Sequence, residues 1–231
     1  MTGRRFISIY TASTHPFYEL PPAEGPKPED SDAAYLKALT FADRALGQMI
    51  ETVTRAGRMD RTLFVITGDH AQPNAWHLEH DGDVGLPNAG RTWTSMLIAG
   101  PDLTPQTVRL DASSHVDVPP TILGYLGISV PNHFFGRDLF STEPERPVIA
   151  VFSNGVAMID GNSMMIGGLE SESVNKFQYD TDTNLAPADY QHGKPLVATP
   201  ADLERFNGAR RAVRAFAWII DHDQLRPPTA Q

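Results

Sequence analysis

Apolar and polar positions alternate along the chain in patterns that predict short strands and longer helices. Arg5 to Thr11 is rich in β-branched and aromatic residues and predicts a buried strand. From Tyr35 to Val53, apolar side chains recur every three or four residues, which predicts a helix that Ser31 caps and Gly57 ends. Thr62 to Thr67 is apolar without alternation, as in a central parallel strand that is covered on both faces.

The order of strand, helix and strand predicts where the polar residues that follow the strands will lie. Crossover connections between parallel strands are right-handed, so both strands should end at the same edge of the sheet. His15 comes just after the first strand, and Gly68, Asp69 and His70 directly follow the second. Ligands of open α/β sheets bind at this edge. We therefore expect His15, Asp69 and His70 to lie on one rim.

Asp69 and His70 are the first candidates for metal binding. At a strand end the two side chains are no longer held on opposite faces, so both can reach one cation. One oxygen and one nitrogen ligand suit Zn²⁺ or Mn²⁺, with Mg²⁺ or Ca²⁺ as alternatives. The competing explanation is a capping or turn pair that binds no metal. Histidines in nearby loops favour the metal site, namely His15, His77, His80 and His115.

The long polar loop after this pair contains further candidates for substrate binding, and its length favours a functional role. His77 and His80 are one group, although a loop histidine on its own is more often a solvated surface residue. Arg91 can bind an oxyanion through two parallel N–H donors. The alternative for Arg91 is a surface ion pair with Asp81 or Asp83.

Three other residues have both a chemical and a structural explanation. His115 precedes a short helix predicted over Val116 to Leu126 and should lie near its N-terminus, where it is either a ligand or a surface residue. Ser13 and Thr14 carry hydroxyls that can act as nucleophiles, but the sequence places no base beside them. Backbone hydrogen bonding in a turn is the simpler role for both.

After Pro144 the pattern changes to short strands with a hairpin turn at Asp160-Gly161, and a long amphipathic helix follows. The predicted elements are strands over Val148 to Phe152, Val156 to Asp160, Ser163 to Gly167 and Lys176 to Tyr179, and a helix over Pro200 to Asp221. The predicted fold class is therefore α/β, with three α/β/α layers and a mostly parallel sheet, plus a small C-terminal antiparallel sheet and helix. The expected domains are residues 1–142 and residues 143–231.

Composition narrows the classes of function. The chain has 231 residues, of which 41% are hydrophobic, so it can bury a substantial core. A formal net charge of −9 argues against a nucleic-acid-binding surface and means that an anionic substrate needs local positive charge, such as a metal. The absence of cysteine excludes thiolate ligands and disulfides. No signal peptide or membrane-spanning run is recognisable, so the sequence alone leaves the compartment open.

Four motifs follow one another between Phe6 and Phe140. They are Ser13-Thr14-His15-Pro16-Phe17, FVITGDH from Phe64 to His70, HVDVPPTILGYLGI from His115 to Ile128, and FGRDLF from Phe135 to Phe140. In this order they resemble the C-terminal half of the catalytic domain of the lipoteichoic acid synthase and phosphoglycerol transferase family. That family belongs to the alkaline phosphatase and sulfatase superfamily. The resemblance covers about 135 residues.

The resemblance implies a metal-dependent phosphoester or sulfate ester transferase or hydrolase of the sulfatase-like type. It implies that Asp69 and His70 are two of the metal ligands and that His15 is the catalytic residue that contacts the substrate phosphate. His77 or His80 stands where related phosphoethanolamine transferases carry another histidine, and His115 stands where some two-metal relatives place a ligand. The implied substrate is a phosphate or sulfate ester, with lipid- or glycan-linked esters as candidates, on the periplasmic or extracellular side of the membrane.

One departure from the family changes what we expect of this chain. In the family, a threonine nucleophile and an acidic metal ligand lie in an N-terminal half that has no counterpart before Phe6. We therefore expect a partial catalytic domain that turns over substrate poorly or not at all without a missing N-terminal half. The alternatives are a non-catalytic metal- or glycan-binding remnant and a hydrolase that uses Ser13 or Thr14.

Overall fold

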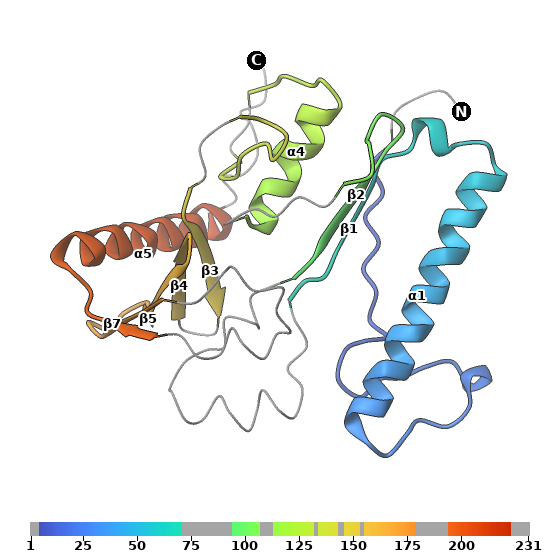
Figure 1. Ribbon diagram of the computed structural model, residues 1–231, viewed down its shortest axis with the longest axis horizontal. Helices are drawn as coiled ribbons and strands as arrows, with labels where there is room; N and C mark the ends of the chain where they lie inside the picture. Colours follow the sequence, from blue (N-terminus) through green and yellow to red (C-terminus); the bar gives the residue numbers. More distant parts are fainter. Residues whose placement is uncertain are drawn as a thin grey trace. The chain divides into compact units, whose positions relative to one another are not determined.

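The computed structural model describes residues 5–70, 94–106, 113–131, 134–142, 146–152, 155–178 and 194–222. The chain forms two compact units. The first comprises Met1–His80 with Thr94–Pro105, and the second comprises Asp81–Trp93 with Gln106–Gln231. The elements of both units are labelled in Figure 1. The division into domains over residues 1–142 and 143–231 stays a prediction.

The first unit is built on the long helix α1 (Ser31–Arg55), which confirms the helix predicted from the apolar period. The Asp30 side chain, not that of Ser31, caps it by accepting a hydrogen bond from the backbone N–H of Ala33 at 2.7 Å. Ala34 and Ala38 are its most buried residues, and they pack against Tyr18 from the preceding loop. Short 3₁₀ helices flank α1, η1 (Pro22–Glu24) and η2 (Met59–Arg61).

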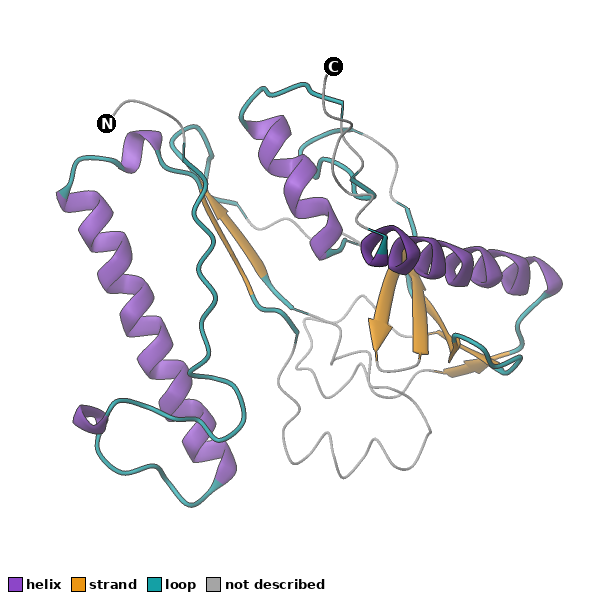
Figure 2. Cartoon of the chain, turned by 180° about the vertical axis from the view of Figure 1, so that it is seen from behind, coloured by secondary structure: helices purple, strands orange, loops and turns teal. Residues whose placement is uncertain are grey.

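Strands β1 (Phe64–Thr67) and β2 (Met96–Ala99) form a two-stranded sheet in the first unit (Figure 2). They pair antiparallel, with Phe64 opposite Ala99, whereas Thr62 to Thr67 was expected to be a parallel strand, so the neighbour that the structure describes for β1 differs from that expectation. Residues 5–11 form no strand in this structure, which corrects the prediction for that segment. A buried central strand needs other elements packed against both of its faces. The main helix of this unit is α1, and one helix can cover only one face.

The second unit contains the helical segment η3 (His115–Asp117) followed by α4 (Val118–Tyr125), and a five-stranded antiparallel sheet with the helix α5 (Pro200–Asp221). The strands in sheet order are β3 (Val148–Phe152), β4 (Gly155–Asp160), β5 (Ser163–Gly168), β6 (Val174–Gln178) and β7 (Lys194–Leu196). The predicted C-terminal antiparallel sheet and helix are thus confirmed, including the β4–β5 turn, where Gly161 has a φ of 56°. The strand β7 was not predicted.

Both faces of the second sheet carry buried side chains. Helix α5 covers one face, where Phe206 packs on Val156, Met158 and Met165. The opposite face buries the alternate residues of β4 and β5, which are Ala157, Met164 and Ile166. A strand buried on both faces is apolar at successive positions, and β4 and β5 show this pattern in Val156 to Ile159 and Met164 to Ile166. Among the helices that the structure describes, none is long and apolar enough to span a bilayer.

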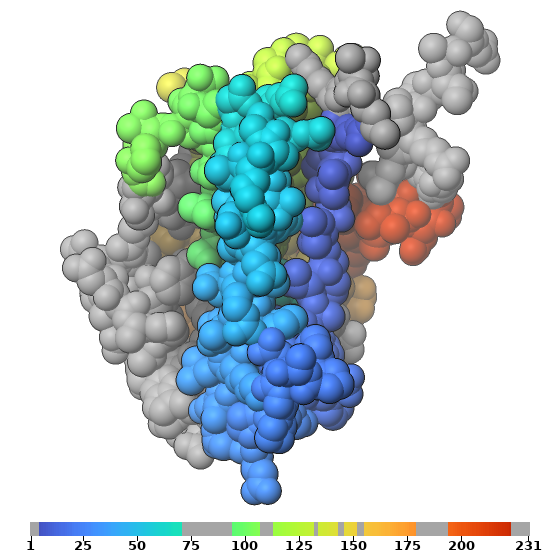
Figure 3. Space-filling model, turned by 90° about the vertical axis from the view of Figure 1, so that its right-hand side faces the viewer, coloured from blue at the N-terminus to red at the C-terminus, as the bar shows by residue number. Residues whose placement is uncertain are grey.

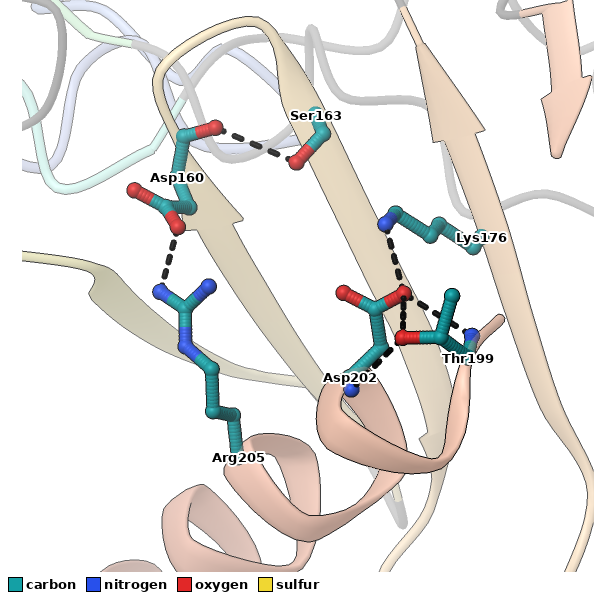
Figure 4. A network of polar contacts seen from close by, with 6 residues as sticks. All are labelled: Asp160, Ser163, Lys176, Thr199, Asp202 and Arg205. Atoms are coloured by element: carbon teal, nitrogen blue, oxygen red, sulfur yellow. Dashed lines mark hydrogen bonds and ion pairs between the residues drawn. The ribbon is translucent and has the colours of Figure 1, made fainter. Parts of the chain in front are cut away.

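Polar contacts join the N-terminus of α5 to the sheet (Figure 4). The carboxylate of Asp202 accepts hydrogen bonds from the Lys176 ammonium at 2.8 Å and from the backbone N–H of Thr199 at 2.9 Å. Arg205 forms an ion pair with Asp160 at the β4–β5 turn. The Lys176 contact, followed by the Thr199 contacts, lowers the pKa of Asp202 to about 2. Asp202 therefore stays ionised in the folded chain at pH values where an unfolded carboxyl is already protonated.

We expect the contribution of Asp202 to stability to disappear in acid. Because its pKa is lower in the folded than in the unfolded chain, the ionised carboxylate stabilises the fold above the unfolded pKa of about 4, and this is lost as the pH falls towards about 2. In urea denaturation series between pH 5 and pH 2.5, Asp202→Asn should flatten the decline in the free energy of unfolding. The exposed control Glu172→Gln should keep the wild-type slope. Equal slopes in the wild type and Asp202→Asn would refute this assignment.

Candidate functional site

The segment Gly68, Asp69 and His70 leaves the sheet at the end of β1, as the sequence predicts. The Thr67 hydroxyl donates to the carbonyl of Ser95, the residue before β2, at 3.1 Å and so fixes the end of β1 to the neighbouring segment. A Cβ atom at Gly68 would overlap the Thr94 hydroxyl. A larger residue at this position would therefore require the Thr94 side chain to move.

The side chains of Asp69 and His70 lie beside each other and point to solvent. Nε2 of His70 is 3.5 Å from Oδ2 of Asp69, and the side chains are 60% and 58% exposed. The other carboxylate oxygen, Oδ1, accepts the backbone N–H of His70 at 3.0 Å. Two ligands of one tetrahedral Zn²⁺ with bonds of about 2.1 Å lie about 3.4 Å apart. The spacing of Oδ2 and Nε2 thus fits a shared divalent cation.

His15 lies in a tight turn of the first unit. Its backbone N–H donates to the Ala12 carbonyl at 3.0 Å, and its own carbonyl accepts from the backbone N–H of Tyr18 at 2.9 Å. Phe17 and Tyr18 both have positive φ angles, 82° and 46°, which is strained backbone for residues with large side chains. The burial of the Tyr18 ring against α1 offsets this strain. The turn thus presents His15 to solvent at the cost of local strain.

The other predicted hydroxyl nucleophiles belong to the same turn. Ser13 and Thr14 are half-buried within it and precede His15 directly. This location fits the turn-forming role that the sequence favoured. Their use as nucleophiles stays a prediction.

The full set of predicted ligands is not assembled by the part of the chain that the structure describes. Within residues 5–70, 94–106 and the other described ranges, no three histidine or acidic side chains gather as a metal cluster. Asp69 and His70 form a pair in the first unit, whereas His115 belongs to the second unit. The predictions for His77, His80 and Arg91 lie outside the described residues.

His115 is the first residue of η3 and is exposed, and a buried carboxylate holds the backbone around it. Asp117 is only 6% exposed. Its Oδ2 accepts the backbone N–H of Ser114 at 2.8 Å, and its Oδ1 accepts the backbone N–H of Arg137 at 2.8 Å. Asp117 therefore joins the helix start to a loop twenty residues further along the chain. The sequence alone does not predict this role of Asp117.

The same two segments are joined at further points. The Thr121 hydroxyl donates to the Asp117 carbonyl at 2.6 Å and accepts the backbone N–H of Leu139 at 3.0 Å. A Cβ at Gly136 would overlap the backbone carbonyl of Val116, so only glycine allows this approach. The motifs HVDVPPTILGYLGI and FGRDLF therefore form one packed structure. The sequence signal for this packing was the position of two polar residues, Asp117 and Thr121, among the apolar residues of this motif.

Comparison with known protein families gives one match over more than half of the chain. The sequence profile of the family described as Sulfatase matches residues 2–128. These residues contain the β1 segment with Asp69 and His70, the His15 turn and the helix start at His115. The match therefore covers all the candidate site residues.

Curated relatives include both sulfatases and a lipoteichoic acid synthase. Choline-sulfatase of Rhizobium meliloti (strain 1021) is 26% identical over 163 residues, which are 68% of this chain and 26% of that protein. Lipoteichoic acid synthase of Staphylococcus aureus (strain USA300) is 26% identical over 179 residues, which are 74% of this chain and 26% of that protein. The chain thus spans about a quarter of the length of these relatives.

The fold is shared with a solved structure of the alkaline phosphatase superfamily from Vibrio parahaemolyticus. The two superimpose with a TM-score of 0.69 at 22% sequence identity. The match covers 94% of this chain but 49% of that chain. This likeness confirms the α/β fold class and shows that the chain corresponds to about half of the solved fold.

Proposed function

Because the chain belongs to the sulfatase family, we propose that it is the metal-ligating part of an enzyme that hydrolyses or transfers phosphate or sulfate esters. The paired side chains of Asp69 and His70 carry this proposal. They stand at a strand end, they are exposed, and 3.5 Å separates Nε2 from Oδ2. The resemblance to the lipoteichoic acid synthase and phosphoglycerol transferase family supports the same two residues as ligands. A missing N-terminal half would supply the nucleophile.

In the proposed site, Asp69 and His70 would hold a divalent cation, with Mn²⁺ or Zn²⁺ as the first candidates. When bound, such a cation offsets the negative charge of ester oxygens and activates a nucleophile. The formal charge of −9 favours this arrangement, because the chain as a whole repels an anionic ester. Any attraction must therefore be local to the site.

His15 is the proposed residue that orients the ester and moves a proton. Its Nδ1 lies 3.1 Å from the Pro16 carbonyl, which can only accept, so Nδ1 carries the hydrogen in this arrangement. Nε2 is then the atom that takes up a proton or gives one to a leaving oxygen.

The substrate class in this proposal is an ester whose transferred group resembles phosphoglycerol, on a lipid- or glycan-linked carrier. The resemblance supports this class and a reaction on the periplasmic or extracellular side of the membrane. His77, His80, Arg91 and His115 are proposed as further contacts to the substrate or metal.

Metal titration tests the proposal directly. Calorimetric titration of the full chain with MnCl₂ and with ZnCl₂ should detect binding that depends on Asp69 and His70. Asp69→Asn or His70→Ala should weaken metal binding by at least roughly 10- to 100-fold. That is the loss caused by removing a residue that only hydrogen-bonds to a metal ligand, and loss of a ligand itself should cost no less. The matched control is Asp60→Asn, an exposed carboxylate of η2 in the same unit, which should bind like the wild type.

Turnover separates the enzyme from the non-catalytic alternative. With the missing half added, hydrolysis of p-nitrophenyl phosphate or sulfate should require Asp69 and His70. Metal binding without turnover would favour a metal-binding remnant instead. Unchanged titrations in both variants would refute Asp69 and His70 as ligands. Full turnover in a Ser13→Ala/Thr14→Ala double variant would exclude those hydroxyls as nucleophiles.

A further inference from the structure

The loop of residues 12–30 brings a lysine back to the turn that presents His15. The Lys27 ammonium donates to the Phe17 carbonyl at 3.2 Å, ten residues back along the chain. The His15 imidazole is hydrogen-bonded to the Pro16 carbonyl at 3.1 Å. Consecutive Cα atoms lie about 3.8 Å apart, so one short stretch of backbone holds both groups. The imidazole and the ammonium therefore belong to the same turn.

Helix α1 fixes both parts of this loop. Figures 1 and 3 show the loop, in blue, folded around the beginning of the helix. The turn is held by the ring of Tyr18, which packs on α1. The segment before Lys27 is held by the Lys37 ammonium, which donates to the Pro26 carbonyl at 2.7 Å. One helix thus preorganises both His15 and Lys27, as a binding site requires.

The Lys27 ammonium keeps hydrogen-bond donors for an anion from outside the chain. An ammonium has three N–H donors, and the Phe17 carbonyl takes one of them. Lys27 is exposed, and among the residues that the structure describes no carboxylate pairs with it, although Glu19 and Glu29 are close in sequence. With 28 acidic and 19 basic residues in the chain, an anionic ester needs a cation that the acidic side chains do not neutralise.

Anchoring of the turn is the simpler explanation for the Lys27 contact, and it accounts for only part of the observations. An exposed hydrogen bond to an uncharged carbonyl stabilises a fold little, and ordering a long lysine side chain costs conformational entropy of similar size. Tyr18 already fixes the turn by its burial. The backbone that holds the ammonium is strained, with a φ of 82° at Phe17, and such strain clusters at ligand-binding sites.

We propose that Lys27 is a substrate-binding residue, and that its ammonium and the His15 imidazole together contact the oxygens of the phosphate or sulfate group of the ester. The ammonium supplies charge-assisted hydrogen bonds to the non-bridging oxygens, while His15 remains the residue that moves a proton. This inference rests on the proposed function, in which His15 orients the ester. It adds a positive contact that the chain itself provides, so the site favours esters whose transferred group is negatively charged.

Titration of the full chain with inorganic phosphate, in the presence of a metal chelator, tests this inference. Phosphate should shift the NMR signals of the His15 imidazole. Lys27→Gln should raise the dissociation constant about 10-fold, as expected for the loss of one hydrogen bond to a charged group. Lys27→Arg keeps the charge and should stay within about 3-fold of the wild type. The control Arg58→Gln removes an exposed cation next to η2 in the same unit and should bind phosphate like the wild type.

Amide exchange at Tyr18, whose N–H donates to the His15 carbonyl, should be unchanged in Lys27→Gln. Faster exchange there together with weaker phosphate binding would make Lys27 an anchor of the turn and overturn the inference. Wild-type phosphate binding in Lys27→Gln would overturn it too, as would the lack of any shift at His15 in the wild type. If Asp69 and His70 bind no metal but phosphate binding depends on Lys27, the proposed metal site fails and this inference stands.

Discussion

Replacing Phe206 with alanine should destabilise the second unit by about 3–5 kcal/mol, the range for truncating a buried Phe. The Phe206 side chain is fully buried between α5 and the sheet, where it contacts Val156 and Met165. The Arg210 guanidinium lies 4.7 Å above its ring. The Phe206 ring therefore contacts both the apolar core and the Arg210 guanidinium. Arg210 in turn donates to the Ser171 carbonyl, in the β5–β6 connection, at 2.5 Å.

Hydrogen exchange under mild urea is the appropriate measurement, because the chain forms two units and a single unfolding transition is not assured. In Phe206→Ala, amides of β4 and β5 should lose protection, while those of α1 in the first unit should be unchanged. Trp218→Ala is the control, since this aromatic side chain on the same helix is 56% exposed. Its effect should stay within about 0.5 kcal/mol. A loss below about 1 kcal/mol in Phe206→Ala would contradict the proposed core.

The C-terminal half was predictable because its signals are local. Two short apolar runs on either side of Asp160-Gly161 predict a hairpin by themselves, and α5 follows from its 3.6-residue period. Strand β7 was missed because it has three residues, all exposed, and contains Pro195. Such a strand has no hydrophobic pattern of its own. It is formed by pairing with β6, which is a tertiary effect.

For residues 5–11, the local pattern of apolar side chains is not sufficient to predict the structure. Their composition predicts a buried strand, yet Phe6 and Tyr10 are exposed in the structure. Burial of a central strand depends on neighbours on both edges and both faces, and these are separate parts of a fold. The apolar pattern of residues 5–11 thus indicates that the segment is suited to a buried position. The expectation that Thr62 to Thr67 is a parallel strand has the same limit, because the direction of pairing is set by the partner strand, and the described partner of β1 is antiparallel.

The candidate site was predictable in part. The pairing of Asp69 with His70 follows from adjacency at a strand end, and the structure places the two side chains together. The role of Asp117 was not predictable, because it depends on a contact with the backbone of Arg137, twenty residues away. A carboxylate inside an apolar motif was the visible signal. Its partners become visible only when the loop is folded against the helix.

Removing the carboxylate of Asp117 should have the second large effect. Asp117→Ala leaves the backbone N–H groups of Ser114 and Arg137 without their acceptor, and the second of these hydrogen bonds is buried. Hydrogen bonds to a charged group contribute about 1.5–3 kcal/mol each, so we expect the second unit to lose at least about 3 kcal/mol. Asp117→Asn keeps the shape but turns an N–H₂ group towards one of the two donors, so it should also be destabilising.

The predicted consequence reaches the candidate site, because Asp117 holds the backbone on which His115 is presented. Amide exchange at Ser114 and Arg137 should accelerate together in Asp117→Ala, since one carboxylate serves both. The exposed control Asp221→Asn, at the end of α5, should change stability by about 0.5 kcal/mol or less. If only one of the two amides accelerates, Asp117 does not act as a shared clamp. If both do, any contribution of His115 to metal or substrate binding should decline in the same variant.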